Sequence, residues 1–225
     1  MTRSLVASFA CLALGFAACG GGSDSKPEEA TPVATPAQDQ HGCTVVDPPT
    51  PKDDTLEPPT EELDPTKTYV ATVDTNCGVF EITLDSKRAP RTAASFKHLS
   101  DAHFYDGTTF HRIVPNFVVQ GGDPLGTGAG GPGYTVLEAP PKRLKYSEGV
   151  VAMAKGGEER AGTSGSQFFI ATGPDALKLP ADYALVGNVT GGEPVVQKLG
   201  AIITDPRTDA PPSPIVIKSI RVAQK

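Results

Sequence analysis

Tryptophan is absent from this chain of 225 residues, aromatic residues make up only 6% of it, and just four cysteines are present. So few cysteines cannot build a disulfide scaffold, and no two of them have the C-x-x-C spacing of a zinc or redox motif. The four histidines show no ligand spacing with cysteines or carboxylates. We therefore expect neither a metal site nor a cofactor.

A nucleophile elbow is also missing, because Ser164 and Ser166 stand in T-S-G-S-Q-F-F and not in G-x-S-x-G. The chain lacks a basic stripe as well. Its net charge of -6 is uneven: residues 20–66 hold eleven acidic and two basic residues, and residues 67–225 hold fifteen and seventeen. We expect no hydrolase triad and no nucleic-acid partner.

The apolar run near the N-terminus, Leu5–Ala18, is too short for a confident membrane span. It follows Arg3 and ends in small residues, so residues 1–18 are predicted to be a secretory signal peptide. The sequence F-A-A-C ending at Cys19 resembles the bacterial lipoprotein signal, in which that cysteine receives lipid. We expect an extracytoplasmic protein anchored to the bacterial cell membrane; plain secretion, with Cys19 discarded or free, is the alternative.

Residues 19–66 consist mostly of Gly, Ser, Pro, Thr, Ala and acidic residues. Such a segment buries too little apolar surface to offset its conformational entropy, and it is predicted to be a disordered, lipid-anchored tether. Cys43 lies in this segment and Cys77 in the domain that follows. In an oxidising compartment the two could form a disulfide, with two independent free thiols as the alternative.

Residues 67–225 are predicted to form one mainly β domain. Two alternating runs, Tyr69–Val73 and Val79–Leu84, flank a turn and indicate a hairpin. Amphipathic helices are expected at Ala89–Leu99 and Glu193–Leu199. Further strands are expected at Thr108–Val114, Phe117–Gln120, Tyr134–Leu137, Val150–Ala154, Gln167–Thr172, Ala184–Val189 and Ile215–Val222. About eight short strands with two helices indicate a closed antiparallel barrel.

The loop Pro124–Gly133 contains a literal G-x-G-x-x-G at Gly126, Gly128 and Gly131. A dinucleotide site would need a helix that begins there, so that its N-terminal amides face the pyrophosphate. Because Pro132-Gly133-Tyr134 disfavours a helix, we interpret the segment as a flexible rim loop.

Two strand-like stretches carry the most informative side chains. Phe110–Asp123 reads F-H-R-I-V-P-N-F-V-V-Q-G-G-D, and alternation places Phe110 and Arg112 on one face. In Gly165–Ile170, which reads G-S-Q-F-F-I, Gln167 and Phe169 share a face. One face can serve a site while the other packs the core. The plainer alternative is that the phenylalanines are core residues and Arg112 is a surface charge.

Both stretches, in this order, resemble signatures of the cyclophilins, the cyclosporin-binding class of peptidyl-prolyl cis-trans isomerases. The resemblance covers about residues 69–222. It implies an eight-stranded barrel with two capping helices, in agreement with the barrel expected from the strand pattern.

The resemblance also implies the site. Arg112 matches the catalytic arginine, Phe117 the floor of the proline pocket, and Lys155 stands where the family usually has Asn. The family's frequent pocket tryptophan is missing. The expected substrate-binding residues are Phe117, Val118, Gln120, Met153, Ala154, Lys155, Gly156, Gln167, Phe169, Leu179 and Tyr183.

The leading hypothesis is a monomeric, lipid-anchored prolyl isomerase that acts on proline-containing polypeptides and assists the folding of secreted or envelope proteins. A non-catalytic proline-peptide binding or chaperone module at the membrane surface is the alternative, since Lys155 and the stretch Gly157–Ser164 at the rim of the site, a few residues longer than usual in the family, could blunt turnover. A solute-binding lipoprotein is disfavoured because such proteins normally need two lobes and a longer chain.

Overall fold

The computed structural model describes residues 36–225. The predicted signal peptide, Cys19 and the first part of the predicted tether lie outside this range. Within it, no helix combines the length and the apolar character needed to cross a membrane.

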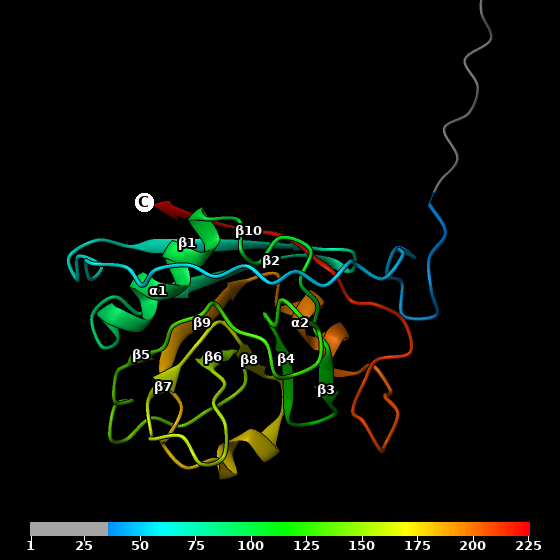
Figure 1. Ribbon diagram of the computed structural model, residues 1–225. Coiled ribbons are helices and arrows are strands. Elements are labelled where there is room, and N and C mark those ends of the chain that lie inside the picture. The colour runs from blue at the N-terminus through cyan, green and yellow to red at the C-terminus, as the bar shows by residue number, and fades with distance from the viewer. Residues whose placement is uncertain (1–35) are drawn as a thin grey trace, which may run out of the picture. The chain divides into compact units, whose positions relative to one another are not determined.

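The fold is built on one curled antiparallel sheet (Figure 1), whose strands run in the order β10-β1-β2-β9-β6-β8-β4-β3. In chain order the strands of this sheet are β1 (Tyr69–Thr75), β2 (Gly78–Leu84), β3 (Arg112–Val114), β4 (Val118–Gly121), β6 (Val150–Met153), β8 (Phe168–Ala171), β9 (Leu185–Gly191) and β10 (Ile217–Gln224). A separate two-stranded sheet pairs β5 (Val136–Leu137) with β7 (Thr163–Ser164). The predicted hairpin is β1–β2, in which Val73 faces Phe80.

The predicted closed barrel is wrong. The sheet curls into a half-barrel, and within residues 36–225 no ladder joins its edge strands β3 and β10. An isolated bridge from Thr109 to Val216 and a few backbone hydrogen bonds, such as that from the Phe110 amide to the Ile215 carbonyl, link the chain before β3 to the start of β10 without forming a ladder. The chain before Arg112 is irregular, so β3 has only three residues and its approach to β10 is not a regular strand pairing.

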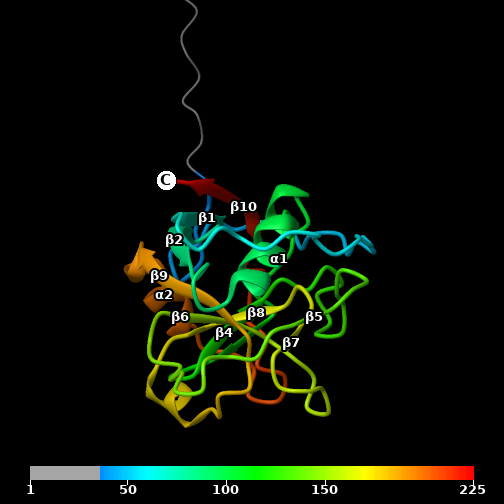
Figure 2. The ribbon, with the colours of Figure 1, turned by 90° about the vertical axis from the view of Figure 1, so that its left-hand side faces the viewer.

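Two α-helices pack on the sheet (Figures 1 and 2): α1 (Pro90–Asp101) against β9 and β10, and α2 (Glu193–Gly200) against β2. Pro90 opens α1, where a missing amide hydrogen costs nothing. The Glu138 carboxylate accepts hydrogen bonds from the Arg91 and Thr92 amides and so caps the helix from a distance. A short 3₁₀ helix, Pro174–Lys178, follows β8.

The sheet has apolar side chains on both faces, in two clusters. Phe168 and Ile170 of β8 belong to the large interior cluster with Phe80, Phe96 and Phe110, whereas Phe169 and Ala171 belong to a smaller cluster on the outer face. This confirms the alternation predicted for β8. The prediction that Phe110 shares a face with Arg112 is wrong, because β3 begins only at Arg112 and Phe110 is fully buried in the interior.

Residues 36–66, here called the strap, lie along the domain and belong to its compact unit. The strap is the blue to cyan segment in Figure 1. A disulfide joins Cys43 to Cys77, and backbone hydrogen bonds join the strap to Asn76, Pro124, Pro132 and Pro90. The predicted free tether therefore does not extend over residues 36–66, and the domain does not begin at residue 67.

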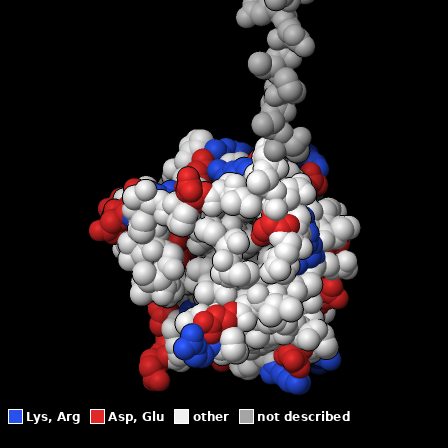
Figure 3. All heavy atoms as spheres, turned by 90° about the vertical axis from the view of Figure 1, so that its right-hand side faces the viewer, with Lys and Arg blue, Asp and Glu red and all other residues white. Residues whose placement is uncertain are grey.

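Charges of both signs are interspersed on the face of the described chain shown in Figure 3. This agrees with the near balance of acidic and basic residues from residue 67 onward.

Candidate active site

Strands β3, β4 and β8 place the predicted site residues side by side on the outer face of the sheet. Arg112 faces Gln120 across the β3–β4 ladder, and Gln120 faces Phe169 across the β4–β8 ladder. Directly opposed residues in antiparallel strands bring their side chains within contact range. The sequence-predicted arginine, glutamine and phenylalanine thus come together through strand register alone.

A chain of hydrogen bonds orders the polar side of the site. Arg112 Nη1 donates to Gln120 Oε1 at 3.4 Å, and Gln120 Nε2 donates to Gln167 Oε1 at 3.1 Å. Gln167 Nε2 in turn donates to the carbonyls of Gly128 and Gly130, both at 3.0 Å. The two carbonyls fix the direction of the Gln167 amide, and that direction is passed on to Gln120 and Arg112.

Asp209, which the sequence did not single out, is the second partner of the arginine. Arg112 Nε donates to Asp209 Oδ2 at 3.1 Å, and the Asp209 carbonyl accepts a hydrogen bond from the Ile113 amide at 2.8 Å. Asp209 has a φ of 56°, a left-handed conformation that Asp tolerates in turns. The Arg112 side chain is 36% exposed, so its remaining donor atoms can face a ligand.

An apolar wall lies beside Arg112. Val118 and Phe169 are buried there, and Phe117, Leu179 and Tyr183 are partly buried against the same cluster. The rings of Phe169 and Tyr183 meet edge to face, with centroids 5.3 Å apart. Together these side chains form an apolar surface next to a fixed cation.

Tyr146, also missed by the sequence, supports this wall from behind. Its hydroxyl donates to the Tyr183 carbonyl at 2.8 Å and accepts from the Tyr183 amide at 3.0 Å. Burial raises the pKa of Tyr146 to about 12, so the hydroxyl stays protonated and both hydrogen bonds persist at neutral pH. The only sequence feature that could have suggested this role is an isolated aromatic residue in a polar segment.

A cavity of about 620 Å³ adjoins the polar chain. Gln120, Gln167, Ala154, Lys155 and Gly156 line one side of it. The Gly-rich loop, residues 124–133, supplies much of the other side. This volume lies in the range of sites that bind small molecules and peptide segments.

Lys155 does not project freely into this cavity. Its ammonium donates to the carbonyls of Gly156 and Glu159 at 3.2 and 3.0 Å and lies 5.7 Å from the centre of the Tyr183 ring. The Glu159 carboxylate accepts a hydrogen bond from the Gly156 amide. The predicted backbone-binding segment is therefore tied into a local turn at the rim.

The prediction that Met153 lines the site is wrong. Met153 is fully buried and packs in the interior cluster with Val151, whereas Val150 and Ala152 point to the outer face. The period of two in β6 turns the Met153 side chain away from Arg112. Among residues 36–225, no group of three or more His, Cys, Asp or Glu side chains could hold a metal ion.

Residues 70–222 match the family model described as cyclophilin type peptidyl-prolyl cis-trans isomerase/CLD. Peptidyl-prolyl cis-trans isomerase B of Streptomyces anulatus is 39% identical over 170 residues, which cover 68% of this chain and 95% of the relative. Peptidyl-prolyl cis-trans isomerase A of Mycobacterium tuberculosis is 37% identical over 177 residues, covering 71% and 94%.

Solved structures give the same result. A cyclophilin type peptidyl-prolyl cis-trans isomerase of Cryptosporidium parvum superposes with a TM-score of 0.64 at 30% identity, over 70% of this chain and 99% of the other. Its structure in the presence of the dipeptide Ala-Pro gives a TM-score of 0.63. By its fold, its outer-face site and its relatives, this chain belongs to the family of cyclophilin-type peptidyl-prolyl cis-trans isomerases.

Proposed function

We propose that Arg112 is the catalytic residue of this isomerase, and that it stabilises the twisted amide of a proline held on the apolar wall. The observation that carries the proposal is the fixed guanidinium, bound by Asp209 and Gln120, on the same face of the sheet as the ring of Phe169.

The reaction needs no nucleophile and no metal. Rotation about a peptide bond crosses a barrier of about 18 to 20 kcal/mol because resonance gives the C–N bond double-bond character. Before proline both isomers are populated, yet uncatalysed exchange takes tens to hundreds of seconds. An enzyme must therefore bind the twisted, deconjugated amide more tightly than either planar form.

The residues of the site divide this task. Phe117, Phe169 and Leu179 hold the pyrrolidine ring, and Val118 and Tyr183 extend the apolar contact. Arg112 donates to the prolyl nitrogen, whose lone pair becomes available only when resonance is lost, or to the adjacent carbonyl. The rest of the peptide lies in the cavity, where it contacts the backbone or side chains of Gln120, Gln167, Ala154, Lys155 and Gly156.

The expected contributions of Arg112 and of peptide binding are large enough to account for the required lowering of the rotational barrier. Shortening exchange from tens of seconds to milliseconds requires roughly 5 to 6 kcal/mol, at about 1.4 kcal/mol per factor of ten. One preorganised donor in a water-poor site supplies on the order of 3 to 4 kcal/mol. Twisting in the bound state supplies about 1 to 5 kcal/mol more. Arg112 is then the largest single contribution, and the binding of the flanking residues supplies the remainder.

Turnover of a proline tetrapeptide tests the assignment. Arg112→Ala should lower kcat/KM by about 10² to 10³, the usual effect of deleting one such donor. The fold should remain intact, because the arginine side chain is 36% exposed and belongs to neither apolar cluster. Phe117→Ala should weaken peptide binding as well. Undiminished turnover by folded Arg112→Ala protein would refute the role of Arg112.

The cellular role that fits the chain is the folding of secreted or envelope proteins by an enzyme anchored through lipidated Cys19. Two observations support this proposal. The apolar N-terminal run ends in small residues directly before Cys19, and Cys43 and Cys77 form a disulfide, which is typical of oxidising, extracytoplasmic compartments.

A further inference from the structure

The Gly-rich loop is held on its two sides by different parts of the chain. On the side of the site, Gln167 donates to the carbonyls of Gly128 and Gly130. On the other side, the strap lies against it. The Lys52 amide donates to the Pro124 carbonyl at 3.0 Å and the Leu56 amide to the Pro132 carbonyl at 2.9 Å.

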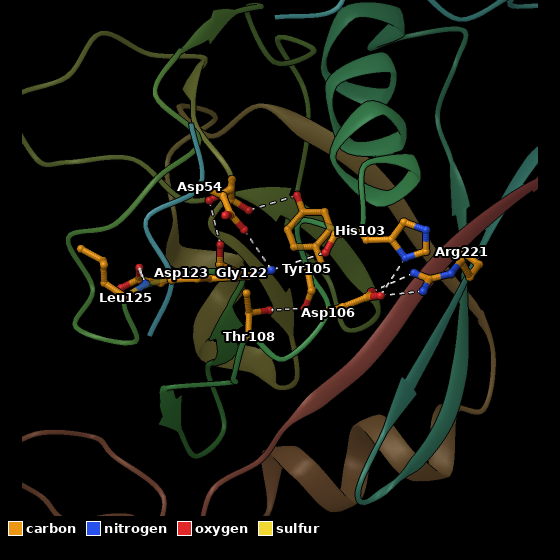
Figure 4. A network of polar contacts seen from close by, with 11 residues as sticks. Asp54, His103, Tyr105, Asp106, Thr108, Gly122, Asp123, Leu125 and Arg221 are labelled. Carbon is orange, nitrogen blue, oxygen red and sulfur yellow. Dashed lines mark hydrogen bonds and ion pairs between the residues drawn. The ribbon is translucent and has the colours of Figure 1, made fainter. Parts of the chain in front are cut away.

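The loop has little structure of its own to fix these carbonyls. Five of its ten residues are glycine, so it loses more conformational entropy on ordering than an average segment. At its base, the buried Asp123 carboxylate accepts hydrogen bonds from the amides of Leu125 and Gly128; Asp123 and Leu125 are labelled in Figure 4. Within the described part of the chain, the backbone hydrogen bonds that join the loop to another segment both come from the strap.

The contact between strap and loop is close. A Cβ atom on Gly133 would lie 2.4 Å from the Thr55 side chain, so only glycine lets the strap approach this far. Leu56 packs against the interior cluster. The Lys52 ammonium lies 5.5 Å from the centre of the Phe104 ring, donates to the His103 carbonyl and pairs with Asp54 of the strap. Asp54 and His103 are labelled in Figure 4.

Both ends of the strap are fixed independently of the loop. At one end Cys43 is bonded to Cys77, and the Thr44 amide donates to the Asn76 carbonyl at 2.8 Å. At the other end Leu63 packs against the interior cluster, and its amide donates to the Pro90 carbonyl. Fixed ends reduce the conformational freedom of the residues between them, which favours their contact with the loop.

We propose that the strap is a positioning element of the isomerase site, in which Lys52 and Leu56 hold the Gly-rich loop in place. Held in this way, the carbonyls of the loop orient Gln167, and its backbone forms one wall of the peptide cavity. The strap lies outside residues 70–222, the part that matches the family model. This role rests on the proposed assignment of the cavity as the peptide site. The strap is expected to affect the binding of the peptide, whereas Arg112 is expected to lower the barrier to rotation of its prolyl amide.

Two matched leucine variants test the inference in the full-length, oxidised protein. Leu56 and Leu63 are both half-buried strap residues on the interior cluster, but only Leu56 adjoins the Gly-rich loop. Leu56→Ala should raise KM for a proline tetrapeptide about fivefold. This factor corresponds to about 1 kcal/mol, the net contribution of one hydrogen bond at the wall of the cavity when the loop is no longer held in place. Its kcat should stay within about twofold of the wild-type value, because the hydrogen bond from Arg112 to Asp209 does not depend on the Gly-rich loop.

Leu63→Ala should leave KM unchanged, although it should lower the free energy of unfolding about as much as Leu56→Ala does. In Leu56→Ala alone, amide hydrogen exchange at Leu125 and Gly128 should become faster. If Leu56→Ala fails to fold, Thr55→Gly, at an exposed position, should raise KM in the same direction. An unchanged KM in the folded Leu56 and Thr55 variants, or an equal rise in Leu63→Ala, would overturn the inference. Loss of Arg112 lowers kcat instead, so failure of the catalytic assignment would be recognised separately.

Discussion

At the scale of single residues, strand register explains most of the site, and loop geometry explains the part that the sequence did not reveal. Arg112, Gln120, Gln167 and Phe169 could be predicted because they stand in two alternating stretches that pair in the sheet. Asp209 could not, since it lies in an irregular proline-rich loop 97 residues from its partner. No periodicity links such a position to Arg112.

His111, the neighbour of Arg112, is a partly buried histidine whose two ring nitrogens are themselves buried and have no hydrogen-bond partner among the described residues. Burial lowers the pKa of His111 below 6.5, although the nearby Asp123 opposes the shift. A lowered pKa means that the unfolded chain binds the proton more readily. The stabilisation from the neutral ring is therefore complete above pH 6.5 and is lost as the pH falls through the lower pKa of the folded state.

His111→Gln should reduce this dependence, because glutamine does not titrate. Urea unfolding at pH 7.5 and pH 5.5 would measure it. The wild-type protein should lose more stability between these values than the variant. Equal losses would show that other groups account for the acid sensitivity.

At the scale of elements, the regular strands and both α-helices were predicted because their apolar residues follow a period of two or of 3.6. The two-residue strand β7 and the 3₁₀ helix Pro174–Lys178 are too short to show a period. The face of Met153 could not be predicted for a different reason. Strand β6 is buried on both faces, so its sequence does not indicate which side chains point toward the site.

The strap was predicted to be a free tether because its composition resembles that of disordered chains. Its order comes from contacts that composition does not encode, including a disulfide, backbone donors to proline carbonyls, and two half-buried leucines, Leu56 and Leu63. Such a segment needs little apolar area, since its ends are fixed by the rest of the domain.

Removing the disulfide with Cys43→Ala and Cys77→Ala should lower the free energy of unfolding by about 3 to 4 kcal/mol, the loop-closure value for a separation of 34 residues. Urea denaturation monitored by far-UV circular dichroism would measure the loss. Reduced wild-type protein is the matched control and should behave like the variant. A loss below about 1 kcal/mol would contradict the loop-closure estimate of the contribution of this disulfide.

At the scale of the whole molecule, one sheet separates two tasks. Its interior face holds the large core around Phe80, Phe96 and Phe168, and its outer face carries the site. The mainly β class, the eight-stranded sheet and the two helices were predicted correctly. The closure of the barrel was not, because closure depends on how far β3 extends, and strand ends are set by tertiary contacts.

The proposed location can be tested on the intact chain in a bacterial host that lipidates such signals. Wild-type protein should sediment with the membranes, and Cys19→Ala protein should not, because it lacks the acceptor thiol. Both forms should contain the disulfide between Cys43 and Cys77. Recovery of the wild-type protein in the soluble fraction would contradict the anchor.

The central claim is that Arg112 lowers the rotational barrier of a bound prolyl amide, while the apolar wall and the cavity bind the peptide. Exchange NMR on a proline peptide saturated with enzyme separates these contributions, because it measures the cis–trans rate in the complex independently of affinity. For Arg112→Ala, we predict an exchange rate lower by about 10² to 10³, with the Kd for the peptide changed by no more than a few fold. A bound exchange rate equal to that of the wild-type enzyme would contradict the account.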